Sequence, residues 1–184
     1  MDKFKNINTH TLNMVYIALF TALMAICAWI TVPFTVPITL QTFAVLTTVG
    51  MLGKKRGTIC VLVYLALGAC GLPVFSGFKG GLGSLLGTTG GYLIGFIFTA
   101  LISGFLIEKS GDSAVKMYIS MVIGVLVCYA FGTAWFYFVY TNGTGPVGII
   151  TILSWCVFPF LLPDAAKIAL SVFIVQRLRK VVRV

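Results

Sequence analysis

Two charged side chains stand inside the apolar C-terminal part of this 184-residue chain. Asp164 and Lys167 lie between the apolar runs 147–162 and 168–175, whereas only 9% of all residues are charged. Placing an acid or a base in hydrocarbon costs about 2.5–3.5 kcal/mol per residue. Their spacing puts both groups on one face of a helix, where they can form an ion pair or hold one ligand together. This pair is our first candidate substrate-binding site.

The same pair also has a purely structural interpretation, as a buried ion pair that locks the last helix. Apolar residues can usually replace such a pair without loss of stability, which favours the binding interpretation. Pro159 and Pro163 cannot both lie inside an unbroken helix, because proline lacks an N–H group and clashes with the preceding turn. We expect the last helix to be interrupted near them, with Pro163 at the start of the part that carries Asp164.

The composition indicates an all-α integral membrane protein in one domain, residues 1–184. Apolar residues make up 59% of the chain, and its mean hydropathy is +1.07. This length accommodates about six transmembrane helices of roughly 20 residues each. The expected segments are residues 12–32, 38–52, 58–73, 90–107, 117–140 and 147–176.

The basic residues predict how these segments cross the membrane. The termini and loops on one side carry Lys3, Lys5, Lys54, Lys55, Arg56, Lys109, Lys116, Arg177, Arg179, Lys180 and Arg183. The loops on the other side carry only Lys79, so the positive-inside rule places both termini in the cytoplasm. A re-entrant hairpin is the rival for residues 38–73, but it leaves three bases at membrane depth. The net charge of +9 is therefore explained by the membrane topology and does not indicate a protein that binds nucleic acid.

Several classes of function lack the residues that they require. His10 is the only histidine and lies in the polar N-terminal segment, so a Ser–His pair or a histidine-containing zinc site cannot form in the membrane. The sequence has no nucleotide-binding motif, so the chain cannot hydrolyse ATP by itself. The five cysteines are scattered without a CxxC pair, which is typical of small buried side chains. We expect no enzyme, no metal site and no cofactor.

Residues 71–92 form a glycine-rich stretch on the expected outer side. Glycine permits tight turns and a close approach of the backbone to a ligand. The stretch is either a lid over a binding site or a flexible connector. Lys79 favours the lid, because it is the only charge in the outer loops and can clamp an anionic group of a ligand.

Other residues near the outer side are further candidates, each with a second interpretation. Gln41 can donate to and accept from a ligand, or it can cap a neighbouring backbone group. Thr88, Gly90 and Tyr92 offer hydroxyl and backbone N–H groups, although Tyr92 also fits the interfacial aromatic belt. Trp155 is the candidate for stacking on a ligand ring, with the same belt role as its alternative.

Five blocks of the sequence, in order between about residues 12 and 175, resemble the BioY family. They are residues 36–43 (VPITLQTF), 53–57 (GKKRG), 71–82, 87–96 and 163–167 (PDAAK). BioY proteins are the biotin-specific substrate-binding subunits, or S-components, of energy-coupling-factor (ECF) transporters. The resemblance implies a six-helix bundle that captures biotin from outside, in a cell membrane of the prokaryotic type.

The resemblance also implies partners. An S-component docks on a transmembrane coupling (T) subunit that carries two ABC ATPase subunits, and ATP hydrolysis there drives transport. It docks through small residues of its first helix, here Ala18 and Ala22, whereas their spacing alone favours internal packing. Many relatives have arginine at the position of Lys79, and lysine keeps the charge but loses the bidentate geometry.

A stand-alone secondary carrier for a small anionic, vitamin-like substrate is the alternative function. Asp164 could then be a proton site, but one acid and one base make a short relay. The sequence also shows no inverted repeat of the kind that many carriers have. The two functions differ in a simple observation, because a binding subunit binds its ligand without a gradient and a carrier exchanges it across vesicles alone.

Overall fold

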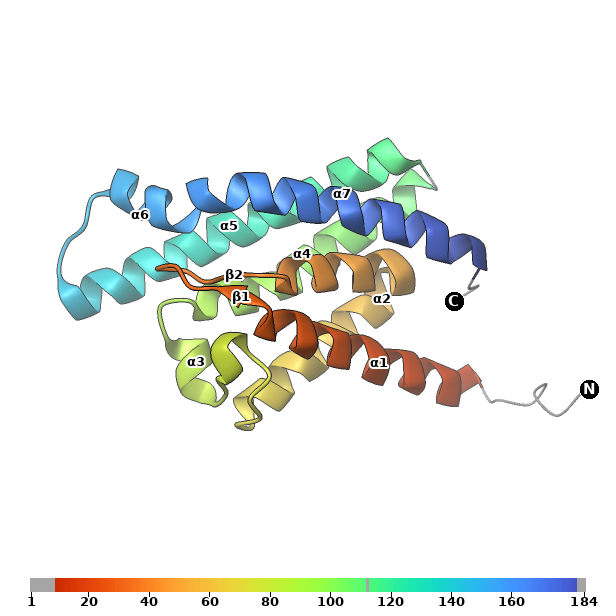
Figure 1. Cartoon of the computed structure of the whole chain (residues 1–184), viewed down its shortest axis with the longest axis horizontal. Coiled ribbons are helices and arrows are strands. Elements are labelled where there is room, and N and C mark those ends of the chain that lie inside the picture. The colour runs from red at the N-terminus through yellow and green to blue at the C-terminus, as the bar shows by residue number, and fades with distance from the viewer. Residues whose placement is uncertain (1–8, 112, 182–184) are drawn as a thin grey trace, which may run out of the picture.

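The computed structural model describes residues 9–111 and 113–181, and helices dominate it (Figure 1). The helices are α1 (Thr9–Trp29), α2 (Gln41–Ala69), α3 (Leu82–Leu86), α4 (Gly90–Ser110), α5 (Ala114–Thr144), α6 (Ile149–Cys156) and α7 (Phe158–Val181). A 3₁₀ turn, η1 (Ser76–Phe78), and a two-stranded antiparallel hairpin, β1 (Thr31–Val32) and β2 (Ile38–Thr39), complete the fold.

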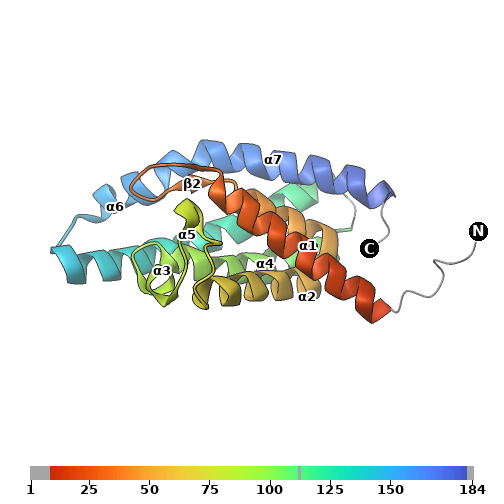
Figure 2. The ribbon, with the colours of Figure 1, turned by 60° about the horizontal axis from the view of Figure 1, so that its bottom comes forward.

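The long helices lie lengthwise beside one another and bury an apolar core between them (Figures 1 and 2). Small residues bring α4 and α5 close together. A Cβ atom on Gly91 would lie 2.2 Å from the Cβ atom of Trp135, and one on Gly95 would lie 2.8 Å from the sulfur of Cys128. These two glycines therefore act as packing positions, as small residues do between membrane helices.

Helix α2 consists of two limbs, because the chain turns back at Gly53. Its φ of 75° and ψ of −178° belong to a region that is essentially open only to glycine. Lys54 donates its backbone N–H to the carboxylate of Glu108 at 2.7 Å, and Arg179 donates its Nε–H to the carbonyl of Gly50 at 2.9 Å. Helices α4 and α7 thus satisfy backbone groups that the break leaves open. The expected segments 38–52 and 58–73 correspond to these two limbs.

The last apolar segment is divided at Val157, two residues before Pro159, as the prolines predict. The expectation that Pro163 starts the second helix is wrong, because α7 begins at Phe158 and contains Pro163. Pro159 lies in the first turn, where its missing N–H has no helical partner in any case. Pro163 removes only the one bond that its N–H would have made to Pro159, and α7 continues through it.

The two ends of the bundle differ in composition. The start of α1, the reversal in α2, the α4–α5 turn and the end of α7 lie at one end, and the β hairpin, α3 and α6 lie at the other (Figure 1). The first end carries Lys54, Lys55, Arg56, Lys109, Lys116, Arg177, Arg179 and Lys180. We call it the basic end. Lys3, Lys5 and Arg183 lie outside the described residues.

Four helical stretches within the described ranges are long and apolar enough to cross a membrane. They are His10–Trp29, Gly90–Lys109, Ala114–Thr144 and Ile149–Val181, the last of which includes both α6 and α7. Each limb of α2 is shorter than these stretches.

Candidate functional site

A cavity of about 460 Å³ lies at the end of the bundle opposite the basic end. Its walls are the β1–β2 loop, the first turn of α2, residues 75–89, the N-terminal half of α4, the middle of α5 and the first half of α7. Volumes of 300–1,000 Å³ are typical of small-molecule sites. Aromatic side chains provide much of the lining, among them Phe75, Phe96, Tyr129 and Phe160.

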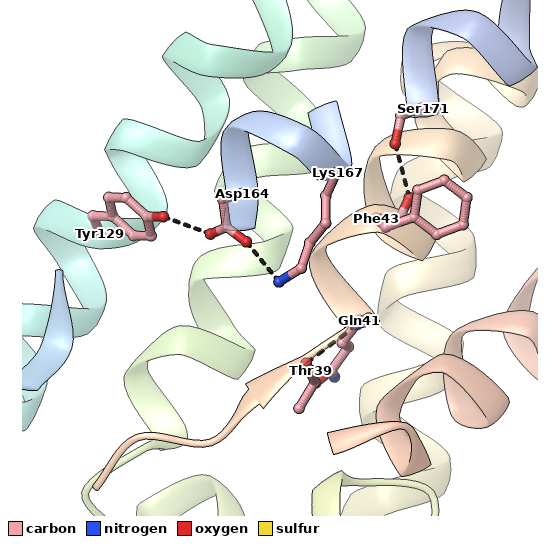
Figure 3. Close-up of polar contacts among 7 residues, drawn as sticks. All are labelled: Thr39, Gln41, Phe43, Tyr129, Asp164, Lys167 and Ser171. Atoms are coloured by element: carbon pink, nitrogen blue, oxygen red, sulfur yellow. Dashed lines mark hydrogen bonds and ion pairs between the residues drawn. The ribbon is translucent and has the colours of Figure 1, made fainter. Parts of the chain in front are cut away.

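The charged pair of α7 lies in this cavity. Lys167 Nζ is 2.7 Å from Asp164 Oδ1, and both side chains are buried (Figure 3). Tyr129 of α5 donates its hydroxyl to the other oxygen, Oδ2 (Figure 3). Within residues 9–111 and 113–181 this is the one ion pair between side chains.

The pair keeps hydrogen-bonding capacity beyond these contacts. An ionised carboxylate has about four acceptor positions, and an ammonium group has three donors. Asp164 uses one position on each oxygen, and Lys167 uses one of its three donors for Asp164. The pair can therefore accept N–H groups of a ligand and donate to an oxygen of the same ligand, with the strength that charge adds to such bonds.

Gln41 enters the cavity from the start of α2. Thr39 of β2 accepts the backbone N–H of Gln41 at 3.1 Å, so the β hairpin leads directly into the first turn of the helix (Figure 3). The side-chain Nε2 of Gln41 donates to the hydroxyl of Tyr64 at 2.7 Å. Gln41 is therefore tied to the second limb of α2 from inside the protein.

Two tryptophans hold the glycine-rich segment in place. Trp29 donates its indole N–H to the carbonyl of Pro73 at 2.8 Å, and its ring stacks on Phe78 with the centroids 5.0 Å apart. Trp135 donates its indole N–H to the carbonyl of Gly87 at 3.0 Å. The segment is thus attached to α1 at one end and to α5 at the other.

Phe75 anchors the first part of this segment in the core, where only 2% of its surface is exposed. Its ring fills the space beside Gly68, since a Cβ atom there would lie 1.9 Å from Phe75 Cζ. The ring also meets Tyr64 edge to face, with the centroids 5.5 Å apart. Lys79, four residues later, is exposed and lies on the cavity lining.

Six of the eight predicted binding residues line the cavity: Asp164, Lys167, Gln41, Lys79, Thr88 and Tyr92. The lining does not include Gly90 or Trp155, which both lie within the described residues. Gly90 is buried against the backbone of Leu85, which is why a side chain has no room there. Trp155 packs edge to face on Tyr140 of α5, with the centroids 5.7 Å apart.

The sequence analysis did not find Tyr129, Phe96 or Phe160. The sequence gives a weak indication of a polar contact at Tyr129, because a tyrosine in the middle of an apolar helix needs a partner for its hydroxyl. The sequence gives no indication of the two phenylalanines, because the same apolar pattern is found whether a phenylalanine of a membrane helix contacts lipid, the protein core or a ligand.

Ala18 and Ala22, the predicted docking residues, are exposed on α1.

Comparison of the sequence with known families and proteins gives consistent matches. A profile of the BioY family matches residues 2–184. The chain is 42% identical over 163 residues to a Thermotoga maritima protein named biotin transporter BioY, which covers 88% of this chain and 92% of the relative. It is 39% identical over 165 residues to a probable biotin transporter BioY of Pyrococcus horikoshii, with coverages of 89% and 93%.

A solved structure is similar over almost the whole fold. It is a crystal structure of the S-component for biotin from an ECF-type ABC transporter. The TM-score is 0.85 and the sequence identity 34%, and the match covers 95% of this chain and 94% of the other. The relatives are thus named as transport proteins and not as enzymes, and the helices are those of a multi-pass membrane protein.

Proposed function

The chain belongs to the BioY family, and from that premise we propose that it is a biotin-capturing S-component of an ECF-type importer. The observation that carries this proposal is the buried pair of Asp164 and Lys167 in a cavity partly lined by aromatic side chains, in a chain similar to an S-component for biotin. Biotin enters from outside, and an ATP-driven partner delivers it to the cytoplasm.

The chemistry of biotin matches the cavity group by group. Its ureido ring has two N–H donors and one carbonyl acceptor, its bicycle and valeryl chain are apolar, and its end is a carboxylate. Asp164 accepts a ureido N–H group and Lys167 donates to the ureido oxygen. The aromatic walls surround the bicycle, as apolar walls do in most small-molecule sites.

The two cations of the cavity set the direction in which biotin lies. Lys167 is buried beside Asp164, whereas Lys79 is exposed on the glycine-rich segment. The neutral ureido ring belongs at the buried end, where the carboxylate of biotin would meet the carboxylate of Asp164 with repulsion. The carboxylate of biotin then lies toward Lys79, which supplies a point charge without bidentate geometry.

We propose six membrane spans with both termini in the cytoplasm, the two limbs of α2 being the second and third spans. The basic end of the bundle supports this orientation, because Lys and Arg are enriched on the cytoplasmic side. The cavity then opens toward the outside.

The native Cys70 tests this orientation. It caps the end of α2 and is exposed, whereas the other four cysteines are buried. We expect a membrane-impermeant maleimide to label Cys70 in intact cells. In a Cys70→Ser background, the exposed Lys55→Cys should label only after the cells are permeabilised. The opposite orientation would be shown if Lys55→Cys were labelled in intact cells and the native Cys70 were not.

The proposed partners are a T subunit and two ABC ATPase subunits. Similarity to the S-component of an ECF-type transporter supports them. ATP-driven uptake needs a partner that hydrolyses ATP, because the sequence has no nucleotide-binding motif. The small exposed side chains of Ala18 and Ala22 offer the close helix approach that docking on a T subunit needs.

Uptake into vesicles separates this function from that of a stand-alone carrier. We expect vesicles that contain only this chain to bind biotin without accumulating or exchanging it. Vesicles that also contain the T subunit and the two ATPases should accumulate biotin when ATP is supplied on the cytoplasmic side. Exchange of biotin by the chain alone, dependent on an ion gradient, would establish the carrier instead.

A further inference from the structure

A buried tyrosine outside the cavity lining is bonded to a residue of that lining. Tyr64 lies on the second limb of α2, and Gln41 is the first residue of the first limb. Their side chains meet at 2.7 Å, from Gln41 Nε2 to Tyr64 Oη. Gln41 is 3% exposed and Tyr64 0% exposed, so bulk water does not compete for this hydrogen bond.

The direction of the hydrogen bonds determines which way the amide of Gln41 points. Tyr64 donates its hydroxyl proton to the backbone carbonyl of Val74 at 2.9 Å. A carbonyl oxygen only accepts and a hydroxyl has one proton, so Tyr64 must accept its hydrogen bond from Gln41. Only the amide nitrogen can donate that bond. Nε2 therefore faces Tyr64, and the oxygen Oε1 faces another direction.

Neighbouring groups hold the ring and the hydroxyl of Tyr64 in this orientation. Its ring is held by the edge-to-face contact with Phe75, which in turn fills the space beside Gly68. Val74, the acceptor of the hydroxyl, immediately precedes Phe75 in the chain. The same anchor thus fixes the tyrosine ring and the carbonyl that sets the direction of its proton.

We propose that Tyr64 is a positioning residue, which holds the amide of Gln41 with its oxygen presented to the ligand as an acceptor. This inference rests on the proposed function and deepens it. At the buried pair, Asp164 and Gln41 Oε1 then supply two acceptors and Lys167 supplies a donor. A cyclic urea has two N–H donors and one carbonyl acceptor, so the three groups complement the three polar atoms of the ureido ring.

A double-mutant cycle on biotin affinity tests the proposal. Tyr64→Phe leaves the amide free to turn, so we expect biotin to bind about tenfold more weakly, which corresponds to the loss of one neutral hydrogen bond. Gln41→Met removes the acceptor itself and should weaken binding at least as much. The double variant should bind no more weakly than Gln41→Met alone, because Tyr64 acts only through Gln41.

Tyr118→Phe is the matched control, since Tyr118 is a half-buried tyrosine near the start of α5 that does not line the cavity. It should leave biotin affinity unchanged. Unchanged affinity in Tyr64→Phe, or additive losses in the double variant, would overturn the positioning role. Failure of the unmodified chain to bind biotin is a different result, which would remove the proposed function and this inference with it.

A second measurement does not depend on the folding of Tyr64→Phe. Two cyclic carbamate analogues of biotin each replace one ureido N–H by oxygen. We expect Gln41→Met to weaken the binding of biotin and of one analogue, and to leave the affinity of the other analogue unchanged. An equal loss for both analogues would show that Gln41 does not accept from a ureido N–H, and would overturn the inference.

Discussion

Replacing Asp164 by asparagine should weaken biotin binding at least about 100-fold. The substitution removes the charge that strengthens the bond from a ureido N–H group. It also leaves the ammonium of Lys167 buried without a counter-charge, and breaking a buried pair from one side costs about 3–5 kcal/mol. Equilibrium binding of labelled biotin to the purified variant measures the effect.

Two further variants make this result specific. Asp164→Asn combined with Lys167→Met removes both charges and should restore thermal stability without restoring binding, because no unpaired charge then remains buried. Glu108→Gln is the matched control at the basic end, where the amide oxygen can still accept the N–H of Lys54. Tight binding by Asp164→Asn, or an equal loss in Glu108→Gln, would contradict the assignment of the site.

Replacing Ala22 by tryptophan should abolish ATP-driven uptake and leave biotin binding unchanged. Ala22 is exposed on α1 and does not line the cavity, so a larger side chain has no direct effect on the ligand. The bulk prevents the close approach of a partner helix that small residues permit. The measurement pairs biotin affinity of the purified variant with uptake by vesicles that contain the complete importer.

Ala169→Trp provides the control for this prediction, because Ala169 is an exposed alanine on α7. We expect this variant to bind and to transport biotin as the unmodified chain does. Full uptake by Ala22→Trp would show that this face of α1 is not the docking surface. Loss of biotin affinity in Ala22→Trp would place the defect in the fold or the cavity rather than in docking.

The charged pair could be predicted from the sequence, whereas its third partner could not. A spacing of three residues is a local property of one helix, so the contact between Asp164 and Lys167 follows once α7 is assigned. Tyr129 lies 35 positions from Asp164 on another helix. Its role depends on how α5 and α7 pack, and periodicity within either segment carries no information about that packing.

The glycine-rich segment shows the same limit. Its composition indicated freedom of the backbone, and left lid and connector as alternatives. The contacts that hold it come from Trp29 and Trp135, which are far away in the sequence, so no local pattern predicts their hydrogen bonds to it. The composition of the segment shows that its backbone can adopt many conformations, whereas hydrogen bonds from distant residues determine which conformation it adopts.

Prolines were a partly reliable guide to the last helix. Pro159 and Pro163 predicted an interruption, and the break at Val157 lies close to them. The position of the helix start was wrong because a single missing N–H early in a helix costs less than a new helix end would. At Gly53 the error is of the opposite kind. A charged loop between residues 52 and 58 was expected, but the chain reverses at this single glycine and the helix continues directly after it.

Equilibrium binding of labelled biotin to the purified, detergent-solubilised chain tests the central claim most directly. The measurement is made without partners, ATP or a gradient, and with unlabelled riboflavin and thiamine in excess as competitors. We predict saturable, tight binding that neither competitor reduces and that unlabelled biotin abolishes. Well-folded protein that binds no biotin, or that releases it to riboflavin or thiamine, would contradict the assignment of this chain as a biotin-capturing subunit.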